Sequence, residues 1–177
     1  MALDKAQFRT LVEQHGPALY RLAFRLLGDA HDAEEVVQDA FRSAWSSRAR
    51  FDPKRGERAW LASILRRRAV DRWRRVGRTL PATSGDAVLD YAIEDRDPFD
   101  NEYTDRMQAA LARLPDDMRE ALLLVVVGEL THQEAADELG APLGTILSRV
   151  SRARRRLRES LLEIDQEKGK QPAAMGP

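Results

Sequence analysis

Apolar side chains recur every three or four residues along most of the chain, the spacing that places them on one face of a helix. No stretch alternates apolar and polar residues as a half-buried strand does. The spacing therefore predicts an all-α protein. Two stripes show it most clearly: Leu19, Leu22, Ala23, Leu26 and Leu27, and Ile146, Val150, Ala153 and Leu157.

Start and stop signals divide the first half of the chain into helices. Pro17 suits the first turn of a helix, and Gly28 suits its end. Asp32, followed by Glu35, resembles a capping box with Asp32 as the cap of the next helix. Pro and Gly within "FDPKRGER" predict a loop, and a further helix is expected after it, to about Arg75.

The second half of the chain predicts a helix-turn-helix. Thr131 followed by Glu134 forms a capping box for one helix. The residues "GAP" at 140–142 predict a short turn, after which Thr145 is expected to cap the last helix. A helix, a turn containing Gly and a second helix are typical of this motif.

Charge is distributed unevenly, although 29 basic and 29 acidic side chains give a formal net charge of zero. The stretch "ILRRRAVDRWRR" holds six arginines in twelve residues, and a second arginine-rich stretch spans 149–158. The acidic residues 81–105 between them also contain Pro and Gly, which predicts an acidic flexible linker. Two such clusters favour an anionic partner, contacted at two places, over solvated helix faces alone.

Composition and motifs argue against several classes of protein. The chain has no cysteine and only three histidines, far apart in the sequence, so neither disulfides nor metal sites are expected. It lacks a phosphate-binding glycine loop and a nucleophile motif, so we expect no cofactor and no enzymatic activity. The first residues do not resemble a signal peptide, and the longest apolar run, "ALLLVVV", is too short to span a bilayer. We therefore expect a cytoplasmic protein without membrane insertion.

The last helix separates into two faces. Ser148, Ser151, Arg152 and Arg155 share a stripe that lies away from the apolar one. Short polar side chains and arginines on one face suit a helix in the major groove of DNA. Because the first turns of a recognition helix approach the base edges, Leu147 joins these candidates. The alternative is an arginine-rich solvated helix at the end of a small bundle.

Both halves together resemble the extracytoplasmic-function (ECF) group of bacterial sigma-70-type sigma factors. The matching text is "DAEEVVQDAFRSAW" and "FDPKRGERAWLASILRRRAVDRWRR" in the first half. In the second half it is "LPDDMREALLLVVVGELTHQEAADELGAPLGTILSRVSRARRRL". The resemblance implies a non-enzymatic subunit that binds core RNA polymerase and directs promoter-specific transcription initiation.

The resemblance also implies two small helical domains. Residues 1–76 correspond to sigma region 2, a helical bundle that binds the polymerase β′ clamp helices and the −10 element. Residues 105–164 correspond to the region 4 helix-turn-helix, which binds the −35 element and the β flap. Residues 77–104 are the linker, and 165–177 are expected to be a disordered tail. Promoter DNA and an anti-sigma factor are the further partners that the family suggests.

The resemblance assigns candidate residues to three surfaces. The clamp-binding candidates are Glu35, Gln38, Asp39 and Arg42, which taken singly could also be ordinary exposed helix residues. The −35 candidates are Thr145, Leu147, Ser148, Arg149, Ser151, Arg152 and Arg155. The −10 candidates are Arg50, Phe51, Lys54, Arg55, Arg58, Arg67, Arg68, Asp71, Arg72 and Arg75.

Four residues need separate comment. Many relatives carry Asn at the position of Arg67, and Lys or Arg at the position of Leu147, so −10 and −35 recognition are expected to differ here. Leu147 could pack on a thymine methyl group. Phe51 could stack on a base or anchor the loop to the core, and Trp60 is expected in the core.

Two other functions would fit parts of the sequence. A stand-alone helix-turn-helix regulator with an N-terminal dimerisation or sensing domain would explain the second half. It would need neither the "DAEEVVQDAF" helix nor the basic helix that follows it. A helical adaptor with no nucleic-acid role would leave both arginine-rich faces unexplained.

Overall fold

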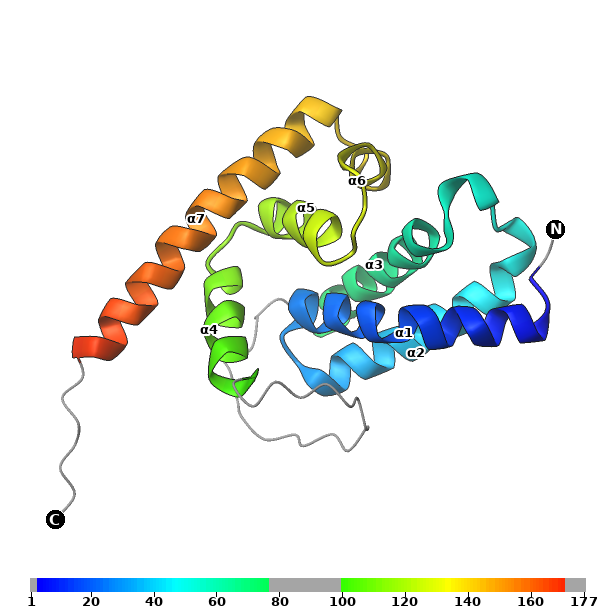
Figure 1. The fold of residues 1–177 in the computed structure, drawn as a ribbon, viewed down its shortest axis with the longest axis horizontal. Helices are drawn as coiled ribbons and strands as arrows, with labels where there is room; N and C mark the ends of the chain where they lie inside the picture. The colour runs from blue at the N-terminus through cyan, green and yellow to red at the C-terminus, as the bar shows by residue number, and fades with distance from the viewer. Residues whose placement is uncertain (1–2, 77–99, 171–177) are drawn as a thin grey trace, which may run out of the picture.

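The computed structural model of the chain describes residues 3–76 and 100–170, and within these ranges helices joined by loops are present, without strands (Figure 1). The predicted all-α class is therefore confirmed. The α-helices are α1 (Lys5–Leu27), α2 (Ala30–Ser47), α3 (Glu57–Val76), α4 (Asp100–Ala112), α5 (Asp116–Val126), α6 (His132–Leu139) and α7 (Leu143–Lys170). Two short 3-10 helices, η1 (Arg48–Arg50) and η2 (Pro53–Arg55), lie between α2 and α3.

Helix α1 is longer than the sequence suggested. It begins at a capping box formed by Asp4 and Gln7 and continues through Pro17 to Gly28. Proline lacks the N–H that would bond to the preceding turn, which is why the pattern predicted a new helix there. Burial of the Leu19–Leu27 face keeps the segment helical across this break. Gly28 ends the helix with a φ of 77°, as predicted.

Helix α2 starts three residues earlier than predicted. Asp29, and not Asp32, is its N-cap, and the Asp29 carboxylate accepts a hydrogen bond from the Asp32 N–H at 2.8 Å. Either aspartate has the chemistry of a cap, and the sequence pattern alone favoured the wrong one. The side chain of Asp32 is consequently free for a contact with α3.

Helices α6 and α7 form the predicted helix-turn-helix. The capping box of Thr131 and Glu134 is present at the start of α6. Gly140 adopts the left-handed conformation, with a φ of 59°, at the start of the turn. Thr145 is not the cap of the last helix, because α7 begins at Leu143 and the Thr145 N–H bonds to the Pro142 carbonyl at 2.9 Å.

The predicted end of the linker and the predicted start of the tail both fall within helices of the structure. Residues 77–99, most of the expected linker, lie outside the described residues, and 100–104 belong to α4. The expected tail is helical over 165–170, where α7 continues. Ion pairs of Arg113, in the turn after α4, with Glu163 and Glu167 at 3.2 and 3.4 Å hold this part of α7 in place.

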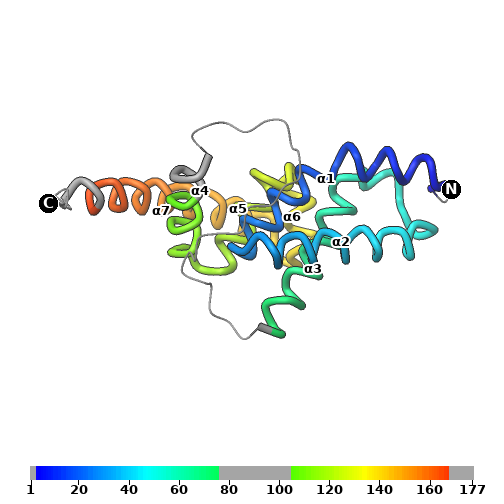
Figure 2. The backbone as a smooth tube through the Cα atoms, turned by 90° about the horizontal axis from the view of Figure 1, so that it is seen from below, coloured from blue at the N-terminus to red at the C-terminus, as the bar shows by residue number. Residues whose placement is uncertain are grey.

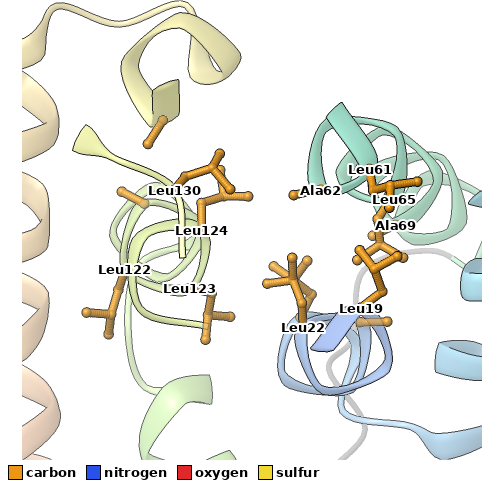
Figure 3. Close-up of a cluster of buried hydrophobic side chains, with 14 of the residues drawn as sticks. Leu19, Leu22, Leu61, Ala62, Leu65, Ala69, Leu122, Leu123, Leu124 and Leu130 are labelled. Atoms are coloured by element: carbon orange, nitrogen blue, oxygen red, sulfur yellow. The ribbon is translucent and has the colours of Figure 1, made fainter. Parts of the chain in front are cut away.

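One apolar cluster joins the two halves of the chain. The buried leucines of α1 and α3 belong to the same cluster as those of α5 and of the turn after it, and α6 adds Ala135 and Ala136. Figure 3 shows the leucines of the two halves facing each other. The joint is made where α1 packs on α5, so Leu19 and Leu22 lie on one side and Leu123 on the other. We call this joint the seam. From below, α1 starts at one end of the molecule and α7 ends at the other (Figure 2).

The buried residues match the predicted stripes. Ile146, Val150 and Ala153 of α7 are buried, and Leu157 packs against the same cluster. Trp60 is in the core as expected. Among the residues that the structure describes, no helix combines the length and apolar character needed to cross a membrane.

Candidate nucleic-acid interface

The α2–α3 face brings together two of the predicted surfaces. An open hollow of about 570 Å³ is lined by Asp39 and Arg42 of α2 and by Arg67, Arg68 and Asp71 of α3. The clamp-binding candidates and the −10 candidates are therefore neighbours. A partner that lies on α2 would border any DNA strand that lies on α3.

The clamp-binding candidates differ in their exposure and in whether they contact another helix. Gln38, Asp39 and Arg42 are exposed, and Arg42 pairs with Asp39 at 2.9 Å on the surface of α2. Glu35 is partly buried and is held by Arg72 of α3 at 2.6 Å. Three of the four candidates can thus reach a partner without breaking a contact between helices.

Arg72 bridges α3 to α2. Its Nε donates to Asp32 Oδ1 at 3.0 Å, and its Nη1 lies 2.6 Å from Glu35 Oε2. The hydrogen bond to Asp32 raises the pKa of Arg72 above its ordinary value, and the charges of Asp32 and Glu35 act in the same direction. The guanidinium is committed to two carboxylates of its own domain. Its neighbour Arg75 is exposed at the end of α3.

The remaining α3 candidates are at the surface. Arg68 donates to Ser43 Oγ of α2 at 3.1 Å and lies 4.0 Å from Asp71. The Arg67 side chain is 67% exposed, and its Nε lies 3.9 Å from the carboxylate of Glu138, in α6. These arginines are presented to solvent on a rigid helix.

The loop between α2 and α3 carries a second set of basic residues. Arg50, Lys54 and Arg55 are exposed on it. Phe51 is turned inward, with its ring 4.9 Å from that of Trp60, so it anchors the loop to the core. Arg58, at the start of α3, contacts Glu129 in the turn between α5 and α6.

The first turns of α7 present the predicted recognition face. Leu147, Ser148, Ser151, Arg152 and Arg155 are all exposed on it, with Leu147 at 47%. The Arg152 Nε donates to the Ser148 carbonyl at 3.2 Å, and its Nη2 donates to the Ser148 hydroxyl at 3.2 Å. Ser148 therefore fixes the direction in which the Arg152 guanidinium points.

Two −35 candidates are placed differently from the rest. Arg149 turns back toward α5, where its Nε lies 3.0 Å from Asp117 Oδ2. Thr145 is partly buried in the first turn of α7, and its carbonyl accepts the hydrogen bond of the Ser148 hydroxyl at 2.9 Å. The Arg149 contact ties the recognition helix to α5, whereas the Thr145–Ser148 hydrogen bond lies within α7.

Comparison with known proteins agrees with this arrangement. The family description of sigma-70 region 2 matches residues 11–79, and that of sigma-70 region 4 matches residues 104–157. The ECF RNA polymerase sigma factor RpoE of Cereibacter sphaeroides is 33% identical over 163 residues, which are 89% of this chain and 88% of that protein. The chain belongs to the ECF sigma factors of the sigma-70 family.

Two further relatives support the assignment. The ECF RNA polymerase sigma factor SigE of Mycolicibacterium smegmatis is 35% identical over 161 residues, and the alignment covers 89% of this chain and 62% of SigE. The co-crystal structure of the sigma factor RpoE with the anti-sigma factor NepR from Bartonella quintana contains a similar chain. That match has a TM-score of 0.71 and 32% identity, and it covers 89% of this sigma factor and 98% of that chain.

The predicted function is confirmed by these relatives. As an ECF RNA polymerase sigma factor, the protein directs transcription initiation. The family is not enzymatic, as the sequence also predicted. The regulator and the adaptor considered from sequence do not describe this family.

Sequence reasoning missed the residues that meet between regions 2 and 4 of this sigma factor. Arg119 of α5 is only 3% exposed, and its guanidinium lies over the ring of Trp73, 5.3 Å from the centroid. Burial lowers the pKa of Arg119, and the nearby acidic charges of Asp116 and Glu120 oppose that shift. The sequence signal was a single arginine inside the apolar stretch "MREALLL".

Replacing Arg72 should destabilise region 2. Arg72→Ala removes the contacts to Asp32 and Glu35, and we expect the free energy of unfolding to fall by about 1–2 kcal/mol for these partly exposed charged contacts. Urea unfolding followed by circular dichroism measures the change. Arg75→Ala is the matched control, because Arg75 is exposed, and it should change stability by less than about 0.5 kcal/mol. Equal effects of the two substitutions would show that the bridge is not structural.

Proposed function

We propose that this sigma factor divides promoter recognition between its two helical units. Residues 1–76 bind core polymerase and the −10 element, and residues 105–164 bind the −35 element. The observation that carries the proposal is that each unit exposes its own arginine-rich face, on α3 with the preceding loop and on α7. Residues 77–104 join the two units.

The polymerase-binding surface is the exposed face of α2. Gln38, Asp39 and Arg42 make the contact with the β′ clamp helices, because they are exposed and make no contact between helices that would have to break. Glu35 contributes through Arg72, which fixes the α2 face relative to α3. The polymerase β flap is the proposed partner of the region 4 unit.

The −10 surface is the basic loop together with α3. Arg50, Lys54 and Arg55 follow the backbone of the melted strand, since exposed cations on a loop suit single-stranded DNA. Arg58, Arg67, Arg68 and Arg75 extend this surface along α3, with Asp71 and Arg72 at its edge. Phe51 supports the loop from inside and does not stack on a base.

The −35 surface is the exposed face of α7. Arg152 is the strongest candidate for a base contact, because Ser148 orients its guanidinium and an arginine fork matches the major-groove edge of guanine. Leu147 offers an apolar contact to a thymine methyl group. Ser151 and Arg155 complete the face, while Thr145 and Arg149 hold it in position.

An anti-sigma factor is the proposed regulatory partner. The support is the RpoE relative, which is seen in complex with the anti-sigma factor NepR. We place the protein in the cytoplasm, where core polymerase and promoter DNA are found.

The proposal is tested by mixing the purified protein with core polymerase and a promoter library, and sequencing the transcripts. We expect new start sites that share −10 and −35 sequences. Specific binding to duplex DNA without polymerase, and no new start sites, would contradict the proposed division of roles.

Arg152→Ala should weaken −35 recognition. Loss of one bidentate base contact costs about 1–3 kcal/mol of discrimination, so selected promoters should lose their preference at one or two −35 positions. Sequencing of the transcripts from the library measures this preference. Arg154→Ala removes the same charge elsewhere on α7 and should weaken all promoters similarly. If both variants lower transcription without changing the preferred sequence, Arg152 does not read a base.

Asp39→Ala should weaken binding to core polymerase and leave the fold intact. Among the described residues, Asp39 pairs with Arg42 alone, on an exposed surface, so folding loses little, whereas we expect Asp39 to contribute more than about 1 kcal/mol to binding as a central interface residue. Binding to fluorescently labelled core polymerase measures the effect, and the dissociation constant should rise about fivefold or more. Glu13→Ala removes an exposed acid from α1 and serves as the control. Unfolding of Asp39→Ala, or normal binding by it, would refute the assignment.

A further inference from the structure

We propose that Arg48 is a positioning residue for −10 recognition. Residues 48–56 connect α2 to α3, and we call them the basic loop. By packing on Trp45, Arg48 fixes the path of the chain out of α2 and so determines where the basic loop presents its cations to the melted strand. The inference rests on the proposed −10 role of Arg50, Lys54 and Arg55.

Arg48 differs from the other basic residues of the basic loop in its burial. Arg50, Lys54 and Arg55 are exposed, whereas Arg48 is partly buried. A cation that serves only to attract phosphates gains nothing from contact with its own protein, because an exposed charge attracts them equally well. The role of Arg48 is therefore to be found in its contacts within region 2.

The contacts of Arg48 converge on one residue, Trp45, in the last turn of α2. The guanidinium carbon lies over the indole ring, 4.0 Å from the ring centroid. The Arg48 Nη1 also donates to the Trp45 carbonyl at 2.8 Å, and the same carbonyl accepts the backbone N–H of Arg48. Main chain and side chain of Arg48 are thus both held by Trp45, which sets the direction in which the basic loop begins.

Trp45 is itself packed on another helix. The start of α1 lies beside the end of α2, and the Phe8 ring of α1 meets the Trp45 ring at a centroid distance of 5.1 Å, with the two planes inclined at 64° (Figure 2). Phe8 also lies 6.4 Å from Phe41, one turn earlier in α2. Arg48 is therefore placed on an aromatic group that two helices hold in position.

The position of Arg48 is passed along the basic loop by short-range hydrogen bonds. The Phe51 N–H donates to the Arg48 carbonyl at 3.3 Å, and the Phe51 ring anchors the loop to the core. The Asp52 carboxylate accepts the Lys54 N–H at 3.0 Å, and the Asp52 carbonyl accepts the Arg55 N–H at 3.1 Å. A shift at Arg48 would therefore move the two cations that follow.

The double contact of Arg48 requires a guanidinium. Its planar group can stack on an aromatic face and donate from its edge to a carbonyl at the same time, whereas the ammonium of lysine is a point charge without a face to stack. Lysine at this position would keep the charge and lose the fixed geometry. The basic loop would then sample several arrangements, and its apparent affinity for DNA would fall by the fraction that remains competent.

The test is Arg48→Lys in the full chain, bound to core polymerase. The ligand is a fluorescent single-stranded oligonucleotide that carries the −10 sequence selected from the promoter library. Its dissociation constant should rise about three- to tenfold, while the melting temperature and the affinity for core polymerase stay unchanged. In the free protein, amide hydrogen exchange at Phe51 and Arg55, followed by NMR, should become about threefold faster or more.

The matched control is Arg9→Lys, the same chemical change at an exposed position on α1. It should alter neither oligonucleotide binding nor exchange in the basic loop. Normal oligonucleotide binding by Arg48→Lys would overturn the positioning role, and so would equal losses in the two variants.

A second substitution distinguishes positioning from a direct contact of Arg48 with DNA. Trp45→Phe weakens the aromatic platform and leaves Arg48 in place, and it should also weaken oligonucleotide binding. Combining it with Arg48→Lys should cost little more than Arg48→Lys alone, because both changes act on one contact. Fully additive losses would show that Arg48 acts independently of Trp45, which contradicts the inference.

A third variant separates this inference from the −10 role on which it rests. Arg50→Ala, Lys54→Ala and Arg55→Ala together remove the exposed cations of the basic loop and should weaken oligonucleotide binding more than Arg48→Lys does. Weaker binding by this triple variant with normal binding by Arg48→Lys overturns the positioning role alone. Normal binding by the triple variant overturns the −10 role of the basic loop, and the positioning role with it.

Discussion

Apolar packing of α1 against α5 determines where every charged surface of this sigma factor lies. Leu19 and Leu22 on one side and Leu123 on the other belong to a single buried cluster that runs through both regions. Because this seam closes, α3 is brought alongside α5 and α6. Arg58, Arg66 and Arg67 of α3 then face acids of region 4, while much of α2 and the first turns of α7 remain exposed.

The acids and arginines that give the chain zero net charge also pair with each other in the structure. Acids and arginines that are far apart in the sequence neutralise each other across the seam, as Arg66 and Glu120 do at 3.1 Å. Within region 2, Arg72 is satisfied by Asp32 and Glu35 of α2. Other arginines remain exposed on α7, on the loop at Arg50 and at the end of α3. A stretch that looks uniformly basic in sequence therefore contains both arginines that pair with acids and arginines that are exposed.

The features that the sequence predicts correctly are local ones. The stripe of Ile146, Val150 and Ala153 needs only helical spacing, and the capping box of Thr131 and Glu134 needs only a separation of three residues. The errors at Asp32 and Thr145 are also local, because several residues near a helix start have the chemistry of a cap and burial decides among them.

The contacts that the sequence could not predict join distant segments. Arg66 and Glu120 are 54 residues apart, and no periodicity relates them. In the sequence, Arg119 is a single cation in an apolar stretch. Only the structure shows that its guanidinium lies over the ring of Trp73. The family resemblance predicted the two domains and the DNA elements that they bind. It carries no information on which residues of the two regions contact each other. Arg67, which departs from the family pattern, acquires a partner only in three dimensions.

The central claim is that α1 packs on α5 and closes the seam between the two regions, and a distance measurement tests it most directly. The chain has no cysteine, so Gln14→Cys and Gln133→Cys place one spin label on α1 and one on α6, both at exposed positions. Pulsed electron paramagnetic resonance then gives the distance between the labels. We predict one short, narrow distribution of distances for the purified protein, as the packing of α1 on α5 requires. A broad distribution centred on longer distances would contradict the account.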